Sequence, residues 1–582
     1  MADRNPRTIG PVGLQLIILG AGVMQGPAIK LAKEMGLETV VVDGDPKAVH
    51  VSRADRFEHI DLKDKEGIEA LARSLKADGR LGGVMTAGTD FSATVAWVAE
   101  RLGLPGIPYE AALNASDKER MRRCFKAAAV PSPAFTVLNS LLPADFTLPF
   151  SFPAVVKPVD NMGGRGCRRI DSMMDLNAAL PEAFKFSRSG RVIVEEYMDG
   201  PEFSVDALVY HGEITICGFA DRHIFFPPYF IEMGHTMPSN FDEDAVNALL
   251  NAFTAGVRAL GLLGDTGAGA AKGDIKLTSR GPMIGEIAAR LSGGYMSGWT
   301  YPYASGVEVT RGAILAALGQ KPDGLIPSRS WTCAERAFIS IPGKVHSIHG
   351  VAEAQAAPHV KNLFLRAESG GRVKFPENNV SKCGNIIAAA PDRETAVTAA
   401  EAAARSVLIR LEAPDRETAA FLATEAAVNA AASTAASGQA VPAAKSDRDQ
   451  GSRHSSDPWC PPAAFAVSSD LAALLAALPD PASGSTGGSA IAASPAAALQ
   501  SPAIIPFPAF TGSGLLDYTG RSVEASLDAV RTIIGLPLPV KPYPGPGGDT
   551  PFLGRQFWAA LIRGGYQGAA YIVDNYARTC EG

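Results

Sequence analysis

Two carboxylates placed inside short apolar runs constrain this chain more than any other feature. Asp274 and Glu286 each stand within a strand-like segment rich in isoleucine and leucine. A charge buried without a partner is costly, so such positions call for a compensating group. Two carboxylates on neighbouring strands would suit a hard divalent cation, which prefers oxygen ligands. Arg290 follows Glu286 closely and would then hold a phosphate or a carboxylate by a two-pronged contact. The alternative is that both acids lie on surface hairpins and that the arginine is structural.

The length and composition exclude several classes of protein. The chain has 582 residues, which predicts about three to four domains at roughly 150 residues each. Hydrophobic residues make up 46% of the sequence, so a sizeable core is expected. The net charge of -6 argues against a protein that binds nucleic acid by neutralising its phosphates.

The sequence also gives an expectation about location. It contains no uninterrupted apolar run of roughly 18 residues, so we expect no membrane-spanning helix and no membrane partner. Residues 1–6 lack the pattern of a signal peptide. The seven cysteines include no CxxC pair, which predicts neither a zinc site nor a disulfide framework. We therefore expect a cytoplasmic protein in a reducing setting.

The N-terminal part of the chain predicts a β-α-β unit. Residues 14–19 and 39–43 are expected strands, and residues 20–26 form a glycine-rich turn into a helix that ends near Met35. An acid about 20 residues after such a turn is typical of a dinucleotide site, but the third glycine comes one residue late. The glycines either help to bind a phosphate or only allow the strand to pack closely against the helix. We expect residues 1–112 to form a doubly wound α/β domain.

Further along, several residues together supply what an ATP site needs. Ser116 or Asp117 is the expected N-cap of a helix that carries Lys118. Lys157 ends an expected strand and precedes a glycine-rich loop. Lysines neutralise phosphates as point charges, and a glycine loop lets backbone N–H groups close over them. Each feature alone is ordinary, because a lysine at a strand end is more often a solvated charge. The carboxylates would hold Mg²⁺ against the phosphate oxygens.

Four sequence blocks resemble the ATP-grasp superfamily across residues 14–412. They are, in order, SDKERMRRCFKAAAVPSP, FPAVVKPVDNMGGRGC, VIVEEYMDGPEFSVDALV, and GDIKL followed by GEIAARLSGG. The resemblance implies an enzyme that uses ATP and Mg²⁺, with Mn²⁺ as the alternative metal. It implies an α/β and α+β multidomain fold. The implied parts are an N-terminal doubly wound α/β domain (1–112), a two-lobed ATP-grasp domain (113–320), a small C-terminal lid domain (321–412), an Ala/Ser/Pro-rich, largely disordered linker (413–500) and a C-terminal module of unknown role (501–582).

The resemblance also implies roles for individual residues. Asp274 and Glu286 would be the magnesium ligands, with Glu286 bridging two ions. Glu195 would face the adenine amino group, and Glu202 would meet the ribose. The residues implied to bind the nucleotide are Lys118, Lys157, Gly163, Gly164, Gly166, Glu195, Glu196, Met198 and Glu202, and the implied catalytic residues are Arg290, Lys157 and His235.

One departure from the family pattern concerns the metal. Many members have Glu-x-Asn, in which the asparagine is a further ligand, and this chain has Ala288 at that position. A second magnesium would then be held more weakly or would complete its shell with water.

The segment 228–238 is similar to the acceptor-side loop of L-amino-acid ligases and carnosine-synthase-like enzymes. His235 would contact the acyl-phosphate or the incoming amine, and the alternative is a loop histidine packed against Tyr229. The implied reaction is an ADP-forming ligation of a small-molecule carboxylate to an amine. Alternatives are a purine-pathway or carbamoyl-phosphate-type reaction, or a nucleotide-binding sensor or scaffold without turnover. A homodimer is common among relatives, and the tail 501–582 is a candidate contact for a partner.

Overall fold

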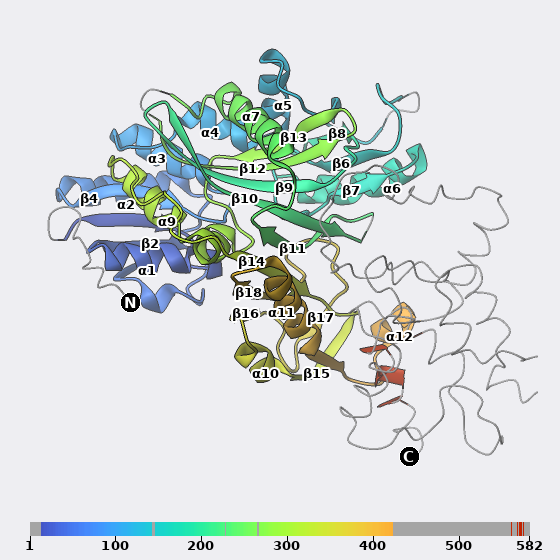
Figure 1. Cartoon of the computed structure of the whole chain (residues 1–582). Coiled ribbons are helices and arrows are strands. Elements are labelled where there is room, and N and C mark those ends of the chain that lie inside the picture. The colour runs from blue at the N-terminus through green and yellow to red at the C-terminus, as the bar shows by residue number, and fades with distance from the viewer. Residues whose placement is uncertain are drawn as a thin grey trace, which may run out of the picture. The chain divides into compact units, whose positions relative to one another are not determined.

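A computed structural model gives the structure of the chain. It describes residues 13–142, 146–226, 228–264, 267–422, 560, 567–568, 570–572 and 574–575. The chain divides into two compact units (Figure 1). The first comprises Met1–Glu335 with Ala389–Ala396, and the second comprises Arg336–Ala388 with Val397–Gly582.

The first unit begins with a parallel four-stranded sheet, as the sequence predicted. One face of this sheet packs its branched side chains against helices α2 and α3. Asp43 ends the second strand, and its carboxylate accepts a hydrogen bond of 2.7 Å from the backbone of Ala21 in the glycine turn. This contact supports the packing interpretation of the turn, because the acid already has a structural partner. The elements are β1 (Gln15–Leu19), η1 (Val23–Gln25), α1 (Gly26–Glu34), β2 (Glu38–Asp43), η2 (Val51–Arg53), β3 (Arg56–His59), α2 (Lys65–Ala77), β4 (Leu81–Thr86) and α3 (Ser92–Leu102), with the sheet order β3-β2-β1-β4.

A small antiparallel sheet follows and carries Lys157. Its apolar face packs against α6, where Leu176 and Leu180 meet Val156 and Val194. Alternating side chains put the opposite set of residues, including Lys157 and Glu195, on the other face. The elements are α4 (Tyr109–Ser116), α5 (Lys118–Ala127), β5 (Phe135–Leu138), β6 (Ala154–Pro158), β7 (Arg168–Ile170), α6 (Met173–Phe186) and β8 (Val192–Glu196), with the sheet order β5-β8-β6-β7.

A larger antiparallel sheet carries the two carboxylates. Helix α7 packs Phe253 and Val257 against Ile284 and Ile287 of this sheet. Its strands in the first unit follow the order β13-β12-β9-β10-β11. They are β9 (Glu202–Tyr210), β10 (Glu213–Phe225), β11 (Ile231–Met237), β12 (Ala268–Thr278) and β13 (Gly281–Ala288), and the helices are α7 (Glu243–Ala259), η3 (Met296–Thr300), α8 (Tyr301–Ser305) and α9 (Val309–Ala317).

One sequence interpretation is corrected by this sheet. The segment 228–238 was expected to be a loop, but residues 231–237 form strand β11, which pairs with β10. The two prolines and the aromatic residues before the strand resemble a loop sequence, whereas the neighbouring strand β10 supplies the backbone partners that sequence alone does not show.

The second unit is an α+β structure. The hexad Pro-Asp-Arg-Glu-Thr-Ala occurs at residues 391–396 and 414–419, and a helix begins within each copy. Asp392, in the stretch that belongs to the first unit, accepts from the Thr395 N–H at 2.8 Å, and Asp415, in the second unit, accepts from the Thr418 N–H at 3.1 Å. The elements completing the chain are β14 (Thr332–Phe338), β15 (Gly343–His349), α10 (Val351–Ala356), β16 (Val360–Leu365), β17 (Arg372–Val373), β18 (Gly384–Ala390), α11 (Arg393–Ser406), β19 (Leu408–Leu411) and α12 (Arg416–Leu422).

Part of the C-terminal tail is held within the second unit by contacts with residues 410–415. Asp574 accepts from the Arg410 guanidinium at 2.6 and 2.8 Å. The Tyr571 hydroxyl donates to the Asp415 carbonyl at 2.8 Å. Most of the predicted linker 413–500 and most of the tail lie outside the described residues. Within the described part of the chain, no helix combines the length and apolarity needed to cross a membrane.

Candidate active site

Helix α5 places Lys118 beside one of the two carboxylates. Asp117 is the N-cap, and its side chain accepts from the Arg120 N–H at 3.0 Å. The buried Lys118 ammonium donates to the Asn161 carbonyl at 2.8 Å and lies 3.4 Å from Glu286 Oε1. Burial alone would lower the Lys118 pKa, but Glu286 and other nearby carboxylates outweigh it and raise the pKa. The lysine is therefore held as a cation.

Lys157 and Glu195 form a buried ion pair across β6 and β8. Lys157 Nζ lies 2.6 Å from Glu195 Oε2, and Arg122 Nε lies 2.9 Å from Glu195 Oε1. Burial opposes ionisation of Glu195, but the charges of Arg122 and Lys157 prevail and lower its pKa. The Glu195 carboxylate thus contacts two cations, and its expected contact with adenine stays a prediction. Arg122 was missed, although it stands one helical turn after Lys118 and therefore on the same face.

The glycine loop has the backbone conformation that glycine favours. Gly163, Gly164 and Gly166 have φ values of 71°, 74° and 69°, which side chains disfavour. Asn161 fixes the start of the loop, because its side chain donates to the Phe186 carbonyl at 2.6 Å and accepts from Met162 N–H at 2.8 Å. The loop leaves its backbone free of bulky side chains at these glycines, which is the arrangement expected of a phosphate-covering loop.

The residues after Glu195 lie where β8 ends. Glu196 Oε1 lies 2.9 Å from the Arg280 guanidinium. The Met198 carbonyl accepts from Lys276 Nζ at 3.2 Å. Their roles in an adenine pocket remain predictions.

The two carboxylates stand on neighbouring strands, the arrangement considered from the sequence, and the structure places them opposite each other. Asp274 and Glu286 are Cα partners in the antiparallel register of β12 and β13. Burial opposes ionisation of both groups. Arg222 and Lys272 prevail at Asp274, and Lys118 prevails at Glu286, so both pKa values are lowered. Both groups are therefore anions in the folded protein.

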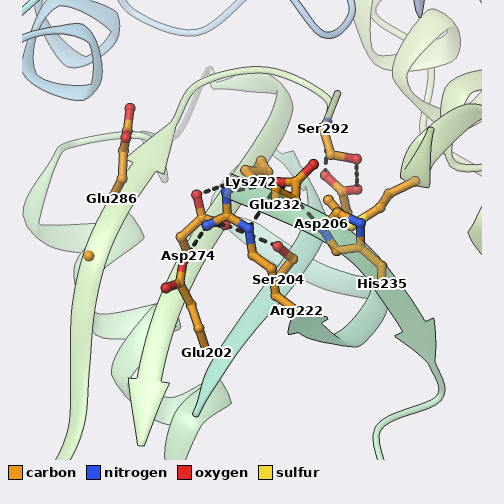
Figure 2. A network of polar contacts seen from close by, with 12 residues as sticks. Glu202, Ser204, Asp206, Arg222, Glu232, His235, Lys272, Asp274, Glu286 and Ser292 are labelled. Carbon is orange, nitrogen blue, oxygen red and sulfur yellow. Dashed lines mark hydrogen bonds and ion pairs between the residues drawn. The ribbon is translucent and has the colours of Figure 1, made fainter. Parts of the chain in front are cut away.

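Arg222 gathers three carboxylates around one guanidinium (Figure 2). It lies 2.8 Å from Glu232 Oε2 and 3.2 Å from Asp274 Oδ1, and it also pairs with Glu202. Lys272 pairs with Asp274 as well. Arg222 and Lys272 were missed by sequence reasoning. For Lys272 the sequence did offer a signal, because Lys272, Asp274 and Lys276 alternate along β12 and therefore lie on one face of the strand. The expected ribose contact of Glu202 stays a prediction.

The donor set fits a magnesium ion that is held mainly by its substrate. Asp274 and Glu286 are ionised oxygen donors on adjacent strands, which is the pair of carboxylates that Mg²⁺ commonly takes together with phosphate oxygens and water. Among the residues that the structure describes, no group of three or more His, Cys, Asp or Glu side chains is arranged to hold a metal. The remaining ligands would therefore come from the nucleotide and from water.

Arg290 leads into a turn that is fixed from two sides. Its guanidinium donates to the Leu291 carbonyl at 2.9 Å, and that carbonyl also accepts from the Gly88 N–H at 3.2 Å. Asp206 accepts from the Ser292 N–H at 3.1 Å and from its hydroxyl. Burial raises the pKa of Asp206 to about 6, although Ser292 and nearby cations oppose this. Asp206, which faces Ser292 in Figure 2, was also missed.

His235 lies in strand β11 with its ring between two carboxylates. Its side chain is fully buried, with Nδ1 2.9 Å from Glu335 Oε2 and Nε2 3.6 Å from Glu232 Oε2. The picture of a loop histidine is therefore wrong. The predicted contact of His235 with substrate remains a prediction.

The N-terminal domain contributes Asp90 to the edge of the site. Burial raises the pKa of Asp90, although Lys118, Arg188 and Arg290 oppose this effect. Asp90 and Arg188 also line a cavity of about 470 Å³. The turn after β4 therefore brings the first domain close to Lys118.

Three family models match separate parts of the chain. The ATP-grasp N-terminal domain matches residues 29–106, the ATP-grasp domain matches residues 150–297, and the L-amino acid ligase C-terminal domain 2 matches residues 337–412. The central match includes Lys157, Asp274, Glu286 and Arg290.

Two curated relatives are similar in sequence. The uncharacterized protein y4rH of Sinorhizobium fredii is 25% identical over 388 residues, which cover 65% of this chain and 79% of the relative. Carnosine synthase 1 of Gallus gallus is 26% identical over 416 residues, which cover 64% of this chain. The match spans only 43% of the length of that synthase.

Solved structures share the fold. The L-amino acid ligase of Bacillus licheniformis superposes with a TM-score of 0.60 at 22% identity and covers 69% of this chain and 100% of its own. N5-carboxyaminoimidazole ribonucleotide synthetase of Thermotoga maritima gives a TM-score of 0.52 at 19% identity and covers 69% and 100%. With the matched domains in this order and the four motif blocks in their expected elements, the chain belongs to the ATP-grasp superfamily.

Proposed function

We propose that this chain is an ATP-dependent ligase that activates a small-molecule or amino-acid carboxylate as an acyl-phosphate and joins it to an amine. The products are an amide, ADP and phosphate. The observation that carries the proposal is the contact of the buried Lys118 ammonium with the partly exposed Glu286, whose partner on the neighbouring strand is Asp274. This arrangement combines a fixed cation for phosphate with two ionised oxygen donors.

Binding of the nucleotide is the first task of the site. Lys118 and Lys157 would offset the charge of the α- and β-phosphates. The loop with Gly163, Gly164 and Gly166 would close over them through its backbone N–H groups and keep water away from the reactive intermediate. Mg²⁺, with Mn²⁺ as the alternative, would be held by Asp274 and Glu286 and would neutralise phosphate oxygens when bound.

For phosphoryl transfer, the protein mainly has to position the reacting groups and offset the charge of the phosphates. A carboxylate oxygen of the acceptor attacks the γ-phosphorus, the bond from that phosphorus to the bridging oxygen breaks, and ADP leaves. Arg290 would offset charge on the transferring group and align the acceptor carboxylate. The orientation of the Arg290 side chain depends on the following turn, which the hydrogen bonds between Asp206 and Ser292 stabilise.

Amide formation completes the proposed reaction. The amine attacks the acyl carbon, a C–N bond forms, and phosphate leaves as the C–O bond breaks. His235 is the proposed contact for the acyl-phosphate or the amine. Glu335 and Glu232 flank its two ring nitrogens, and they would keep the ring in one orientation.

The comparisons favour a carboxylate–amine ligase over other reactions of the superfamily. The C-terminal match is to a domain of L-amino acid ligases, and the curated relatives include carnosine synthases. The second candidate is a purine-pathway or carbamoyl-phosphate-type reaction, because similar proteins include N5-carboxyaminoimidazole ribonucleotide synthetase and carbamoyl phosphate synthase. A homodimer, a cytoplasmic location and a partner for the tail remain predictions.

Phosphate release from MgATP, measured against a matrix of amino acids and small carboxylates, tests the proposal. Release that requires two co-substrates and disappears in Glu286→Gln supports the ligase. ATP binding without release for any pair would favour the nucleotide-binding sensor or scaffold. Identification of the product separates the ligase from the other reactions of the superfamily.

A further inference from the structure

Arg122 links the two halves of the proposed ATP site without lining either of them. It follows Lys118 by one turn of α5, and its side chain is fully buried. One end of its guanidinium meets Glu195 in the small sheet, and the other meets the strand that carries Glu286 in the larger sheet. We infer that Arg122 is a positioning residue that sets both Lys157 and Glu286 for nucleotide and metal. This inference rests on the proposed function, since it assumes that the site binds ATP.

The first contact controls how tightly Lys157 is held. Glu195 is buried and shares its two oxygens between Arg122, at 2.9 Å, and Lys157, at 2.6 Å. An ammonium has three donors, so Lys157 can pair with Glu195 and still donate to a phosphate. Without Arg122, the full charge of Glu195 would act on Lys157 alone. The lysine would then be drawn toward the protein carboxylate and away from the nucleotide.

The second contact fixes a local irregularity beside Glu286. In the register of β12 and β13, Asp274 faces Glu286 while Ile275 faces Ile284, so the pairing steps over Gly285. Such a bulge re-aims the neighbouring side chain and takes the extra residue out of the regular ladder. The Gly285 carbonyl accepts from Arg122 Nη2 at 2.6 Å. Arg122 therefore anchors the bulge that directs the Glu286 carboxylate.

Arginine suits this position because its rigid, planar guanidinium can place its charge beside Glu195 and at the same time donate from Nη2 to the Gly285 carbonyl. A lysine at position 122 would keep a positive charge beside Glu195, but a single ammonium would not also reach the Gly285 carbonyl in the same geometry. The two contacts can therefore be separated by substitution. Arg122→Lys retains the first contact, and Arg122→Met removes both.

The experiment measures equilibrium binding of ATP to the full chain without acceptor, first without metal and then across a Mg²⁺ titration. We expect Arg122→Met to weaken binding without metal by about tenfold and to raise the Mg²⁺ concentration for half-maximal binding by about tenfold, the lower end of the range for losing a group that orients metal ligands. Arg122→Lys should restore metal-free binding to within about threefold but leave the Mg²⁺ requirement raised. The matched control is Arg123→Met, because Arg123 is its exposed neighbour and pairs only along the helix with Glu119 in the described contacts. It should behave as wild type.

A double variant covers the case in which Arg122→Met fails to fold. Removing one member of a buried ion pair is strongly destabilising, whereas neutralising both members is better tolerated. Arg122→Met combined with Glu195→Gln should therefore fold. Compared with Glu195→Gln alone, it should show little further loss of metal-free ATP binding but the same increase in Mg²⁺ requirement.

Four outcomes of these binding measurements bear on the inference. In one outcome, the losses of metal-free ATP binding caused by Arg122→Met and by Glu195→Gln simply add in the double variant. In another, the Mg²⁺ requirement is unchanged in every Arg122 variant. Either result would overturn the inference and leave the proposed function standing. A wild-type chain that binds no ATP would overturn both. The pattern described above would establish Arg122 as the positioning residue.

Discussion

Lys118 and Glu286 are 168 residues apart in the sequence, yet their charged groups lie 3.4 Å apart in the candidate site. The contact joins the N-terminal turn of α5 to strand β13. It brings the lysine proposed to bind phosphate next to a carboxylate proposed to bind metal. A preorganised pair of this kind avoids the cost of assembling charges during the reaction.

Glu286→Gln should lower turnover by at least ~10²-fold, the scale of losing one preorganised electrostatic group. The amide keeps the shape of the side chain but supplies no negative charge to a metal or to Lys118. Steady-state phosphate release with the accepted co-substrates is the measurement. Glu213→Gln is the control, since Glu213 pairs with Lys321 at an exposed position. Turnover close to that of wild type would rule out the metal assignment.

Arg290→Ala should be similarly severe in kcat, about 10²-fold, because the guanidinium is expected to act on the transferring phosphate. Rates measured over a range of ATP and acceptor concentrations separate kcat from KM. Arg73→Ala is the control, because Arg73 is exposed and pairs with Glu69 on α2. An effect confined to the KM for ATP would place Arg290 away from the transferring group.

His235→Asn should uncouple the reaction. If His235 contacts the acyl-phosphate or the amine, ATP cleavage should continue while amide formation falls by about 10²-fold. The ratio of amide to phosphate, followed in the same samples, reports this directly. An unchanged ratio in a folded variant would remove His235 from the second step.

The burial of Asp206 should appear as a pH dependence of stability. Its pKa is raised from 3.8 to about 6 in the folded protein, so the folded state binds its proton more tightly than the unfolded state does. The stabilisation is complete below pH 3.8 and is lost as the pH rises to about 6, with a total of roughly 3 kcal/mol at most. The difference in unfolding free energy between wild type and Asp206→Asn should therefore fall as the pH rises from 3.8 to about 6 and then level off. Urea unfolding of both proteins across this range measures it, and a constant difference would contradict the raised pKa.

Gly166→Ala should destabilise the protein more than Gly190→Ala does. Both glycines have positive φ values, of 69° and 70°, so both substitutions carry backbone strain of about 1 kcal/mol or more. A Cβ at Gly166 would also approach the Ala183 Cα at 3.1 Å, whereas one at Gly190 would meet no atom within 4 Å. Because the two variants share the backbone strain, the difference between their thermal unfolding temperatures reports the steric crowding at Gly166. Equal losses would mean that the loop and α6 adjust freely.

Short-range patterns made much of the fold predictable. Asp117 was identified as a helix cap because its side chain bonds to a backbone group three residues away. The two hexads at the starts of α11 and α12 contain caps of the same short-range kind. The placement of Asp274 and Glu286 on neighbouring strands was suggested by two apolar runs that lie close together in the sequence. Each of these depends on residues that are close in the sequence.

The sequence by itself determined the helix caps, the strand runs and the set of charged residues that an ATP site needs. Only the tertiary structure decided which charges meet. Arg222 gathers Glu202, Glu232 and Asp274 because β9, β10, β11 and β12 pair in one register. Arg122 reaches both Glu195 and the bulge beside Glu286 because α5 docks on two sheets at once. The physical reason is that caps and turns depend on local backbone geometry, whereas a buried ion pair depends on where distant elements place its two ends.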